Sequence, residues 1–469
     1  MPQPQQPLRP LPQQPARPQP TARPGAPGQP PAQSAPPAGP LLAPTGFEPS
    51  PSRSIEDTGL NIGFLSDLLM KVMYFEGFIS GATLSDRIKL PFTGVVDQVL
   101  DFLKREQYCE VRSAASGFGE QSYQYAISTK GRDKAREALD RSQYAGPAPV
   151  TLLAHNQAML KQGLKNFVVH QRTIRQAMSD MVMSEQLMGQ IGPAVNSGRS
   201  LFLFGSPGNG KTAIAERIGR MVLTGDIYIP YAVEVDGQVI KVFDSVNHQP
   251  VPDETGTGGL QKPRQRDMRW VRIRRPVITV GGELTLEGLD LTFDDVNKFY
   301  EAPFQMKANG GMFLIDDFGR QQVRPRDLLN RWILPLEKRI DFLTLRTGRK
   351  IEIPFDVLIV FSTNLAPRDL VDEAFLRRIR HKIEVNDPTF EEYREIFKRV
   401  CEAKGVPYDE RALGYLIQDW YIKRRAKLRS VHPRDLIDQL LDISRYMNVE
   451  PRLTKDLIDR ACHAYFVQL

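Results

Sequence analysis

The chain has 469 residues, which is too long for a single hydrophobic core and indicates two or three domains. Its 62 Lys and Arg residues outnumber its 55 Asp and Glu residues to give a net charge of +7, which is mild for this length and does not by itself indicate nucleic acid. Three widely spaced cysteines form no disulfide framework, and no apolar run reaches the ~20 residues of a membrane span, so we expect a cytoplasmic protein without membrane insertion.

Residues 1–57 form a tail of Pro, Gln and Ala with almost no large apolar side chains. Such a segment cannot bury enough surface to offset the entropy lost on ordering, so it is predicted to be disordered with a polyproline II bias. We interpret it as a solubilising tail. Docking of a partner through its prolines is the alternative.

Residues 58–142 are predicted to form a small α+β domain. Apolar spacing indicates helices over 61–78, 83–90 and 91–107. Two alternating runs at 109–114 and 121–128 flank a Gly-containing turn, which is a hairpin pattern, and a charged helix follows over 129–142. This order of elements resembles a winged-helix domain.

The third of these helices would be the recognition helix of a winged-helix protein, and its charge disfavours DNA. It carries Asp97, Asp101 and Glu106 against only Lys104 and Arg105. Carboxylates are repelled by the closely spaced phosphates of a DNA groove. A protein-docking domain is therefore favoured, and DNA binding stays the alternative.

An apolar strand at 201–204 runs into the loop GSPGNGKT, which is a phosphate-binding motif. Its glycines let successive backbone N–H groups point at a β-phosphate, Lys211 reaches the β- and γ-phosphates, and Thr212 offers a hydroxyl to Mg²⁺. The helical pattern that follows places these phosphates at a helix N-terminus. The predicted nucleotide-binding residues of the loop are Gly205, Ser206, Pro207, Gly208, Asn209, Gly210, Lys211 and Thr212.

ATP is the expected nucleotide, because guanine specificity would normally show an NKxD motif. The only Asn-Lys pair, at Asn297-Lys298, continues with Phe-Tyr.

A second motif, GMFLIDD, is a buried strand that ends on two acids, Asp316 and Asp317. After a phosphate-binding loop this pattern looks like a Walker B motif. Asp316 would then hold the hydrated Mg²⁺, and Asp317 would polarise the attacking water. A core strand capped by two surface acids is the structural alternative.

A third motif, VLIVFSTN, ends at Asn364 and is followed by DEAFLRRIR over Asp372–Arg380. Together they resemble the second region of homology of AAA+ ATPases. The resemblance implies that Asn364 orients the attacking water. It also implies that Arg377 and Arg378 reach the γ-phosphate of a neighbouring subunit, and therefore a homo-oligomeric ring, expected to be a hexamer.

A fourth motif, HPRDL, lies in a helical C-terminal region over 386–469. It resembles the sensor 2 motif of the AAA+ lid, which implies that Arg434 contacts the γ-phosphate within its own subunit. His432 is interpreted as a helix cap rather than a metal ligand. The resemblance covers the chain from about residue 150 onward and implies a parallel α/β nucleotide-binding domain over 143–385 with this helical lid.

Two alternating runs around a Thr-Gly-Arg turn, IDFLTL and IEIPF, precede the strand that ends at Asn364. This hairpin resembles the one found in MoxR-type ATPases, magnesium-chelatase subunits and bacterial enhancer-binding activators. The last group is set aside because its GAFTGA loop is not seen. The arrangement also resembles, faintly, chaperone-like ATPases linked to Flp pilus assembly. These resemblances imply a ring ATPase that remodels a protein client.

Two features depart from that family. Asp317 stands where Glu is usual, and its shorter side chain favours slow turnover or an ATP-binding scaffold without hydrolysis.

A long insert over about 226–285 contains an Asp-Gly hairpin and then a basic run around Trp270. The run comprises Lys262, Arg264, Arg266, Arg269, Arg272, Arg274 and Arg275.

Three interpretations of the basic run stay open. It could bind single-stranded nucleic acid, grip an acidic protein partner, or protect an edge strand by charge. The first would make the chain a DNA-associated ATPase, which is the second function considered.

Overall fold

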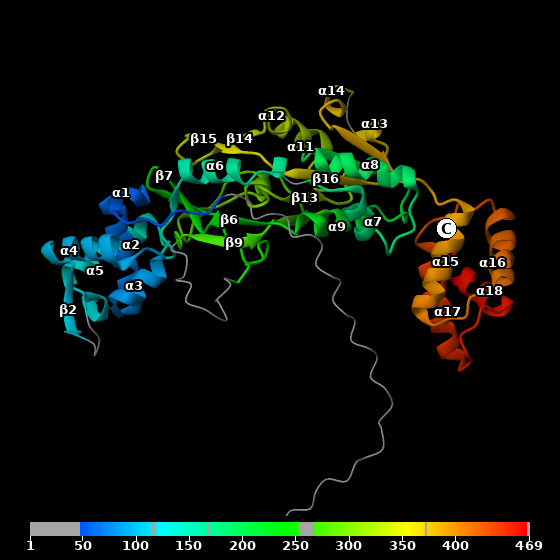
Figure 1. The fold of residues 1–469 in the computed structure, drawn as a ribbon, viewed down its shortest axis with the longest axis horizontal. Coiled ribbons are helices and arrows are strands. Elements are labelled where there is room, and N and C mark those ends of the chain that lie inside the picture. Colours follow the sequence, from blue (N-terminus) through cyan, green and yellow to red (C-terminus); the bar gives the residue numbers. More distant parts are fainter. Residues whose placement is uncertain (1–46, 115–118, 167, 253–265, 371–372, 467–469) are drawn as a thin grey trace, which may run out of the picture. The chain divides into compact units, whose positions relative to one another are not determined.

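The centre of the fold is a five-stranded parallel sheet with strand order β10-β13-β16-β5-β17 (Figure 1). The computed structural model describes residues 47–114, 119–166, 168–252, 266–370 and 373–466. The sheet strands are β5 Ser200–Phe204, β10 Val277–Val280, β13 Met312–Ile315, β16 Leu358–Thr363 and β17 His381–Glu384. The predicted α/β class with a parallel sheet is confirmed.

Helices cover both faces of this sheet, which is why its middle strands β13 and β16 are buried along their whole length. One face packs against three helices, and the other packs against two helices and an aromatic cluster in which Phe202 stacks on Phe361. The five helices are α7 Gln171–Ala177, α8 Glu185–Asn196 and α9 Lys211–Val222 on the first face, and α11 Pro325–Arg331 and α12 Ile333–Lys338 on the second.

The strand order places β5 at a switch point in the sheet. The chain leaves β5, crosses to the edge strand β10, returns through β13 and β16, and adds β17 on the other side of β5. In open α/β sheets, ligands bind in the crevice beyond the carboxyl ends of the strands at such a point. The topology therefore directs attention to the loop that follows β5.

The segment between the N-terminal domain and β5 is divided into several separate elements. It forms α6 Leu152–Lys161, a short 3₁₀ turn at Leu164–Asn166, and then α7 and α8 as separate helices. The Asp356 carboxylate accepts a hydrogen bond from Leu164 N at 2.7 Å and would clash with a side chain at Gly163. This long-range contact ends the first helix.

The insert forms two further sheets. Antiparallel strands β6 and β9 pair with each other, and a five-stranded mixed sheet has the order β11-β12-β8-β7-β4. The Asp-Gly hairpin is confirmed as β7–β8, with Asp236 and Gly237 both at positive φ. The strands are β4 Val150–Thr151, β6 Asp226–Pro230, β7 Ala232–Val235, β8 Gln238–Lys241, β9 Trp270–Arg274, β11 Thr292–Asp294 and β12 Phe299–Glu301.

The bounds predicted for the insert, about 226–285, do not match these sheets. The mixed sheet continues to Glu301, where β12 pairs with β8, and the chain enters the central sheet earlier, at β10. A 3₁₀ turn at Glu287–Leu289 precedes β11, and α10 (Phe304–Lys307) follows β12 and leads into β13.

The hairpin before Asn364 is confirmed as β14 Ile340–Thr344 and β15 Lys350–Pro354. Its inward side chains join one apolar cluster with α6 and the insert. Near its turn, Arg346 forms an ion pair with Asp295 and Arg349 forms one with Asp236, and both acids belong to the insert. The hairpin is therefore attached to the insert along its length.

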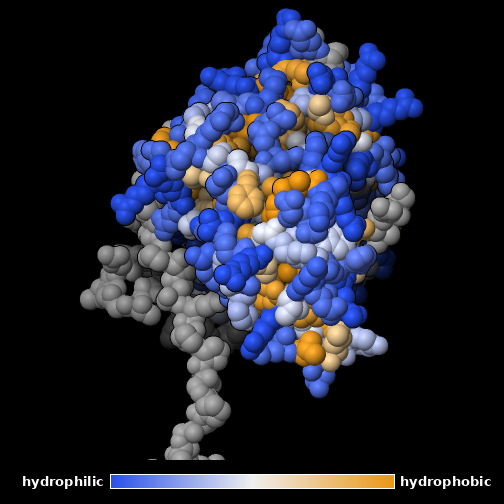
Figure 2. Space-filling view, turned by 90° about the vertical axis from the view of Figure 1, so that its right-hand side faces the viewer, coloured by the Kyte–Doolittle hydropathy of each residue, from blue (hydrophilic) through white to orange (hydrophobic). Residues whose placement is uncertain are grey.

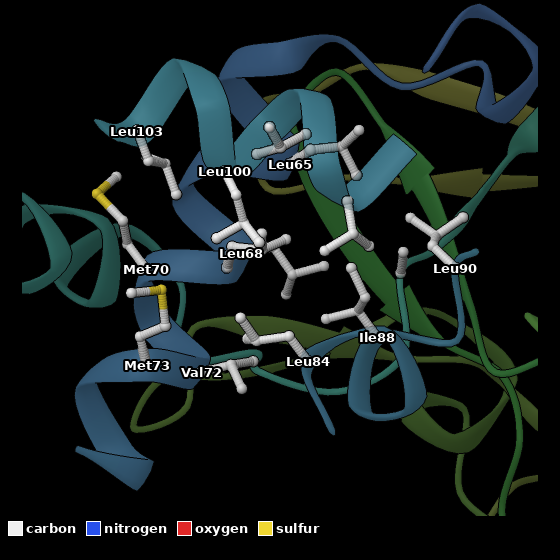
Figure 3. Close-up of a cluster of buried hydrophobic side chains, with 14 of the residues drawn as sticks. Leu65, Leu68, Met70, Val72, Met73, Leu84, Ile88, Leu90, Leu100 and Leu103 are labelled. Carbon is white, nitrogen blue, oxygen red and sulfur yellow. The ribbon is translucent and has the colours of Figure 1, made fainter. Parts of the chain in front are cut away.

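The N-terminal domain forms around one apolar core, most of it contributed by three helices (Figure 3). Its three-stranded sheet has the order β1-β3-β2, and the predicted hairpin is confirmed as β2–β3. The elements are α1 Ile55–Thr58, α2 Ile62–Glu76, β1 Phe78–Ser80, α3 Gly81–Ile88, α4 Asp97–Arg105, β2 Cys109–Ala114, a 3₁₀ turn at Glu120–Ser122, β3 Tyr123–Ile127 and α5 Thr129–Arg141.

Two helix starts in this domain differ from prediction. Helix α3 begins at Gly81 rather than at residue 83, and Ser80 caps it, because the Ser80 hydroxyl accepts from Thr83 N at 3.1 Å. The next segment, Phe92–Val96, is a π-helical turn in which Thr93 and Gly94 leave helical geometry, so α4 begins only at Asp97.

The end of the predicted tail also differs. Residues 1–46 lie outside the described part, but 47–57 are packed against the insert. The Phe47 ring meets Trp270 edge-on at 5.7 Å, and Ser52 is buried. Helix α1 starts with a capping box formed by Ser54 and Asp57. Apolar and capping contacts therefore hold this short segment against the protein.

The C-terminal region is helical, as predicted, and has its own apolar core. After α13 Pro367–Leu370 and α14 Glu373–Leu376 come α15 Phe390–Lys404, α16 Glu410–Leu416, a π-helical turn at Ile417–Ile422, α17 His432–Met447 and α18 Lys455–Tyr465. The face shown in Figure 2 is mostly hydrophilic, with small separate apolar patches. Among the described residues, no helix combines the length and apolar character needed to cross a membrane.

Candidate functional site

The loop after β5 has the backbone geometry that its glycines predict. Gly205, Gly208 and Gly210 have φ values of 137°, 81° and 84°. A Cβ atom on Gly205 would lie 2.4 Å from the carbonyl oxygen of Val385, and one on Gly208 would lie 2.7 Å from the Val431 side chain. Both the backbone conformation and the space therefore require glycine at these two positions.

Lys211 is the first residue of α9, and its ammonium group is folded back over the loop. The side chain is buried, and Nζ donates to the carbonyl oxygens of Gly205 at 3.0 Å and Ser206 at 2.9 Å. Burial lowers the Lys211 pKa, and the carboxylates of Asp317 and Asp316 oppose that shift. A bound phosphate would stabilise the charged form in the same way.

Thr212 and Asp316 lie together and offer oxygen atoms of the kind that ligate Mg²⁺. The Thr212 hydroxyl donates to Asp316 Oδ2 at 2.9 Å, and Asp316 Oδ1 accepts from the main-chain N–H of Asp317 at 3.0 Å. Mg²⁺ commonly takes one or two protein ligands and completes its shell with water and phosphate oxygens. The described residues contain no cluster of three or more His, Cys, Asp or Glu side chains suited to a metal.

Asp317 and Asn364 face each other beside this pair. Asn364 Nδ2 donates to Asp317 Oδ1 at 3.3 Å, so the acid after β13 and the amide after β16 form one polar edge. Asp317 has φ of 49°, a left-handed conformation that Asp and Asn adopt more readily than other side chains. This backbone conformation is a physical reason for Asp in place of the longer Glu.

The lid contacts the loop directly. The main-chain N–H of Val431 donates to the carbonyl of Gly208 at 2.8 Å, immediately before α17 begins at His432. Arg434, in the first turn of α17, lines the cavity above the loop and has 62% of its side chain exposed. The predicted residue is thus beside the phosphate-binding loop of the same chain.

His432 is not the helix cap that the sequence suggested. Its Nδ1 lies 2.9 Å from the Tyr421 hydroxyl, which in turn contacts the Tyr393 hydroxyl at 2.9 Å. Burial lowers the His432 pKa to about 4, so the ring is neutral at pH 7. The side chain is part of the lid core.

These elements enclose a cavity of about 910 Å³, within the range of small-molecule sites, roughly 300–1,000 Å³. Its lining includes the loop, Asp317, Asn364 and Arg434. It also contains apolar side chains of the kind that can accept a planar base. Its apolar lining comprises Met181, Met183, Leu187, Val385, Pro388, Ile396, Val400 and Ala403.

Arg377 and Arg378 are not brought to this cavity. They follow α14, where Arg377 pairs with Glu373 at 3.3 Å and Arg378 pairs with Glu337 at 2.6 Å. Within the described part of the chain, neither arginine is among the residues that line the cavity. Any contact with a γ-phosphate would have to be made in another copy of the chain.

The described arginines of the basic run, Arg266 to Arg275, do not form an open cationic surface. The first two members of the run, Lys262 and Arg264, lie outside the described residues. Arg266 lies over the ring of Tyr228, with its guanidinium carbon 5.6 Å from the ring centre.

Arg269 is the most enclosed member of the run, with 4% of its side chain exposed. Its guanidinium group forms a bidentate pair with Asp267. It also donates to the carbonyl oxygens of Thr58 and Pro149 and to the Ser52 hydroxyl. This arginine therefore joins the N-terminal segment to the insert.

The remaining three arginines also have internal partners. Arg272 and Arg274 both pair with Asp226 on the neighbouring strand β6, at 2.8 and 3.0 Å. Arg275 is buried and donates to two main-chain carbonyls. The described guanidinium groups of the run are thus used within the protein, to hold neighbouring segments together.

Sequence reasoning missed one group at the site. Asn209 was predicted only as a loop residue, but its amide binds Asp387 in the linker after β17, and Asp387 also pairs with Arg429 of the lid. Asp387 and Arg429 belong to no motif recognised in the sequence. Only the structure brings the three residues together.

The comparisons with known proteins are weak over most of the chain. A family model described as a domain of unknown function, DUF8689, matches residues 389–464, which are the lid helices. No curated protein matches the chain.

Among solved structures, NtrX from Brucella abortus is 15% identical with a TM-score of 0.36, over 62% of this chain and 57% of that one. A structure of NtrX in complex with ATP gives 16% and 0.36 over the same shares. The RuvB Holliday junction branch migration motor of Thermotoga maritima is 13% identical with a TM-score of 0.33, over 66% and 73%. The chain thus spans 57% of the length of the NtrX chains.

Replacing Arg269 with Ala should destabilise the protein by about 3–5 kcal/mol, because it leaves the buried carboxylate of Asp267 without its counter-charge. Arg274→Ala, at the end of strand β9 that Arg269 immediately precedes, is the matched control. It should cost about 0–1 kcal/mol, since Arg274 is 40% exposed and Arg272 still pairs with Asp226. Urea denaturation of both variants checks this. Equal, small losses would contradict the internal role of Arg269.

Proposed function

We propose that the chain is an AAA+ ATPase of the MoxR-like group that binds ATP with Mg²⁺ and hydrolyses it. The observation that carries the proposal is the convergence of Lys211, the Thr212–Asp316 pair and the Asp317–Asn364 pair beside one cavity. Three separate strand ends of a parallel sheet supply these groups, at the point where such sheets bind ligands.

The roles of the residues follow from their positions. The N–H groups of the loop and Lys211 hold the β- and γ-phosphates, and Arg434 contacts the γ-phosphate from the lid. Thr212 and Asp316 hold Mg²⁺, which would neutralise charge on the phosphate oxygens. Asp317 and Asn364 orient a water molecule, whose oxygen attacks the γ-phosphorus while the bond to the bridging oxygen breaks. ADP and inorganic phosphate leave, and Asp317 accepts the proton.

We further propose that the active form is a homo-oligomeric ring, expected to be a hexamer. The cavity of one chain contains cations from the loop and the lid but neither Arg377 nor Arg378 among its described lining residues. An arginine from a neighbouring copy would complete the charge around the γ-phosphate. Such a contact is worth about 10³–10⁵-fold in rate where it has been measured.

A protein client is favoured over nucleic acid. The described arginines of the insert have internal partners, and helix α4 of the N-terminal domain presents Asp101 and Glu106 to solvent. The domain, interpreted as a winged helix, also exposes Phe75 and Phe78, which suit an apolar protein contact better than a phosphate backbone. If the chain binds DNA and a plot of log binding constant against log salt concentration has a negative slope of several units, the DNA-associated alternative would be favoured.

Lys211→Ala should abolish ATP binding, because the phosphates lose their main point charge. We expect Kd to rise at least ~100-fold, equivalent to about 2.8 kcal/mol. Titration with a fluorescent ATP analogue measures this. Arg220→Ala, an exposed cation at the other end of the same helix, is the matched control and should bind normally. If Lys211→Ala binds within about threefold of wild type, the site assignment is wrong.

Asp317→Asn should preserve ATP binding and stop hydrolysis, since Asp316 remains while the water loses its carboxylate. Asn tolerates the left-handed backbone at this position, so the variant isolates the charge. Phosphate release and nucleotide titration on the same preparation separate the two effects. Turnover equal to wild type would remove Asp317 from the mechanism, and a wild-type protein that binds ATP without turnover would favour the scaffold alternative.

Hydrolysis should depend on association of subunits. Specific activity should rise with protein concentration, and mixing Arg378→Ala with Lys211→Ala subunits should recover part of the activity, because some interfaces then pair an intact loop with an intact arginine. Each variant alone, at the same total concentration, is the control. Concentration-independent turnover by a species that sediments as a monomer would exclude the ring.

A further inference from the structure

Three side chains from three segments meet at the tip of the phosphate-binding loop. Asn209 is a loop residue with 4% exposure, and its Nδ2 donates to Asp387 Oδ1 at 2.8 Å. Arg429 forms an ion pair with the same carboxylate oxygen. Asn209 Oδ1 accepts from the main-chain N–H of Ser430 at 3.3 Å. We call Asn209, Asp387 and Arg429 the loop latch.

The loop latch joins parts of the chain that are far apart in sequence. Asn209 follows β5, Asp387 lies in the linker between β17 and α15, and Arg429 lies just before α17. A main-chain bond from Val431 N to Gly208 O runs beside it. The start of α17 is thus held to the loop by one carboxylate, one amide and two main-chain N–H groups.

This anchoring determines where the next turn of α17 lies. Arg434 is three residues beyond Val431 and is among the residues that line the cavity, where its guanidinium pairs with Asp435 at 3.1 Å. Arg429 is outside the described lining of the cavity and pairs with Asp387. The direct contact that Arg429 makes is therefore with the linker. A change in its contact with Asp387 would shift the start of α17 and the Arg434 guanidinium together.

We propose that the loop latch positions Arg434 and thereby sets the preference of the site for ATP over ADP. The inference rests on the proposed function and names residues that it does not include. Only ATP carries the γ-phosphate that Arg434 reaches, so misplacing Arg434 weakens ATP binding selectively. A purely structural fault in the phosphate-binding loop would weaken ATP and ADP binding alike, because both nucleotides bind there through the β-phosphate.

The decisive experiment compares Arg429→Ala, Arg434→Ala and the double variant in the full chain. Kd is measured for ADP and for a non-hydrolysable ATP analogue, both with Mg²⁺. We expect Arg429→Ala to lower the ATP-over-ADP preference about 5–20-fold while the Kd for ADP stays within about threefold of wild type. The double variant should lose no more than Arg434→Ala alone, because both changes remove the same contact.

The chain offers a matched control and two supporting variants. Lys427→Ala removes an exposed cation two positions before Arg429 and should leave the preference unchanged. Arg429→Lys keeps a cation beside Asp387 and should restore most of it. In unliganded Asn209→Ala, hydrogen exchange at the amides of Ser430 and Val431 should accelerate, which reports on the anchoring without any nucleotide.

The outcomes separate this inference from the proposed function. Equal weakening of ATP and ADP by Arg429→Ala, or losses that add to those of Arg434→Ala, would overturn the positioning role. If Lys211→Ala abolishes binding and Arg434→Ala lowers the ATP preference while Arg429→Ala changes nothing, only the loop latch is wrong. If Lys211→Ala still binds ATP, the nucleotide site itself is wrong, and the inference is overturned with it.

Discussion

The fold depends on the close approach of other segments to the bare backbone of the loop between β5 and α9. The main chain at Val385 presses on Gly205, and the Val431 side chain presses on Gly208, at distances that leave no room for a Cβ atom. Because these two neighbours come from the end of the central sheet and from the lid, the loop is the point at which both meet. A loop held in this way keeps its N–H groups aligned before any ligand arrives, which reduces the entropy lost on binding.

The parts of the fold predicted from the sequence are those that depend on local patterns. Strands β5, β13 and β16 were predicted because each is an apolar run that ends at a motif, and the hairpins β7–β8 and β14–β15 because their turns contain Gly. The break before α7 could not be predicted, because it depends on the Asp356 carboxylate, which is almost 200 positions away along the chain. Pairing of β12 with β8, which extends the insert, is likewise a contact between distant segments.

In the candidate site, too, local motifs could be predicted from the sequence and contacts between distant segments could not. Lys211, Thr212, Asp316, Asp317, Asn364 and Arg434 were predicted from their motifs, and the structure places all six around one cavity or at its edge. Three partners of Arg269, namely Thr58, Pro149 and Ser52, lie more than a hundred residues away along the chain. Asn209 and Asp387 are also 178 residues apart, and Arg429 follows Asp387 by 42. Charge alone could not show that Arg269 is internal, since a basic run has the same sequence whether its partners are carbonyls within the protein or phosphates outside it.

The hairpin β14–β15 offers a route from the site to the rest of the chain. It leads directly into β16 and Asn364, and its turn is paired with Asp236 and Asp295 of the insert. Phe299 of the insert packs against the core of the N-terminal domain.

A structure solved with a non-hydrolysable ATP analogue and Mg²⁺ would test the proposed nucleotide site directly. We expect the β- and γ-phosphates to bind the loop N–H groups and Lys211, and Mg²⁺ to lie beside Thr212 and Asp316. The base should pack against Met181 and Val400. A nucleotide bound elsewhere, or none bound at saturating concentration, would contradict it.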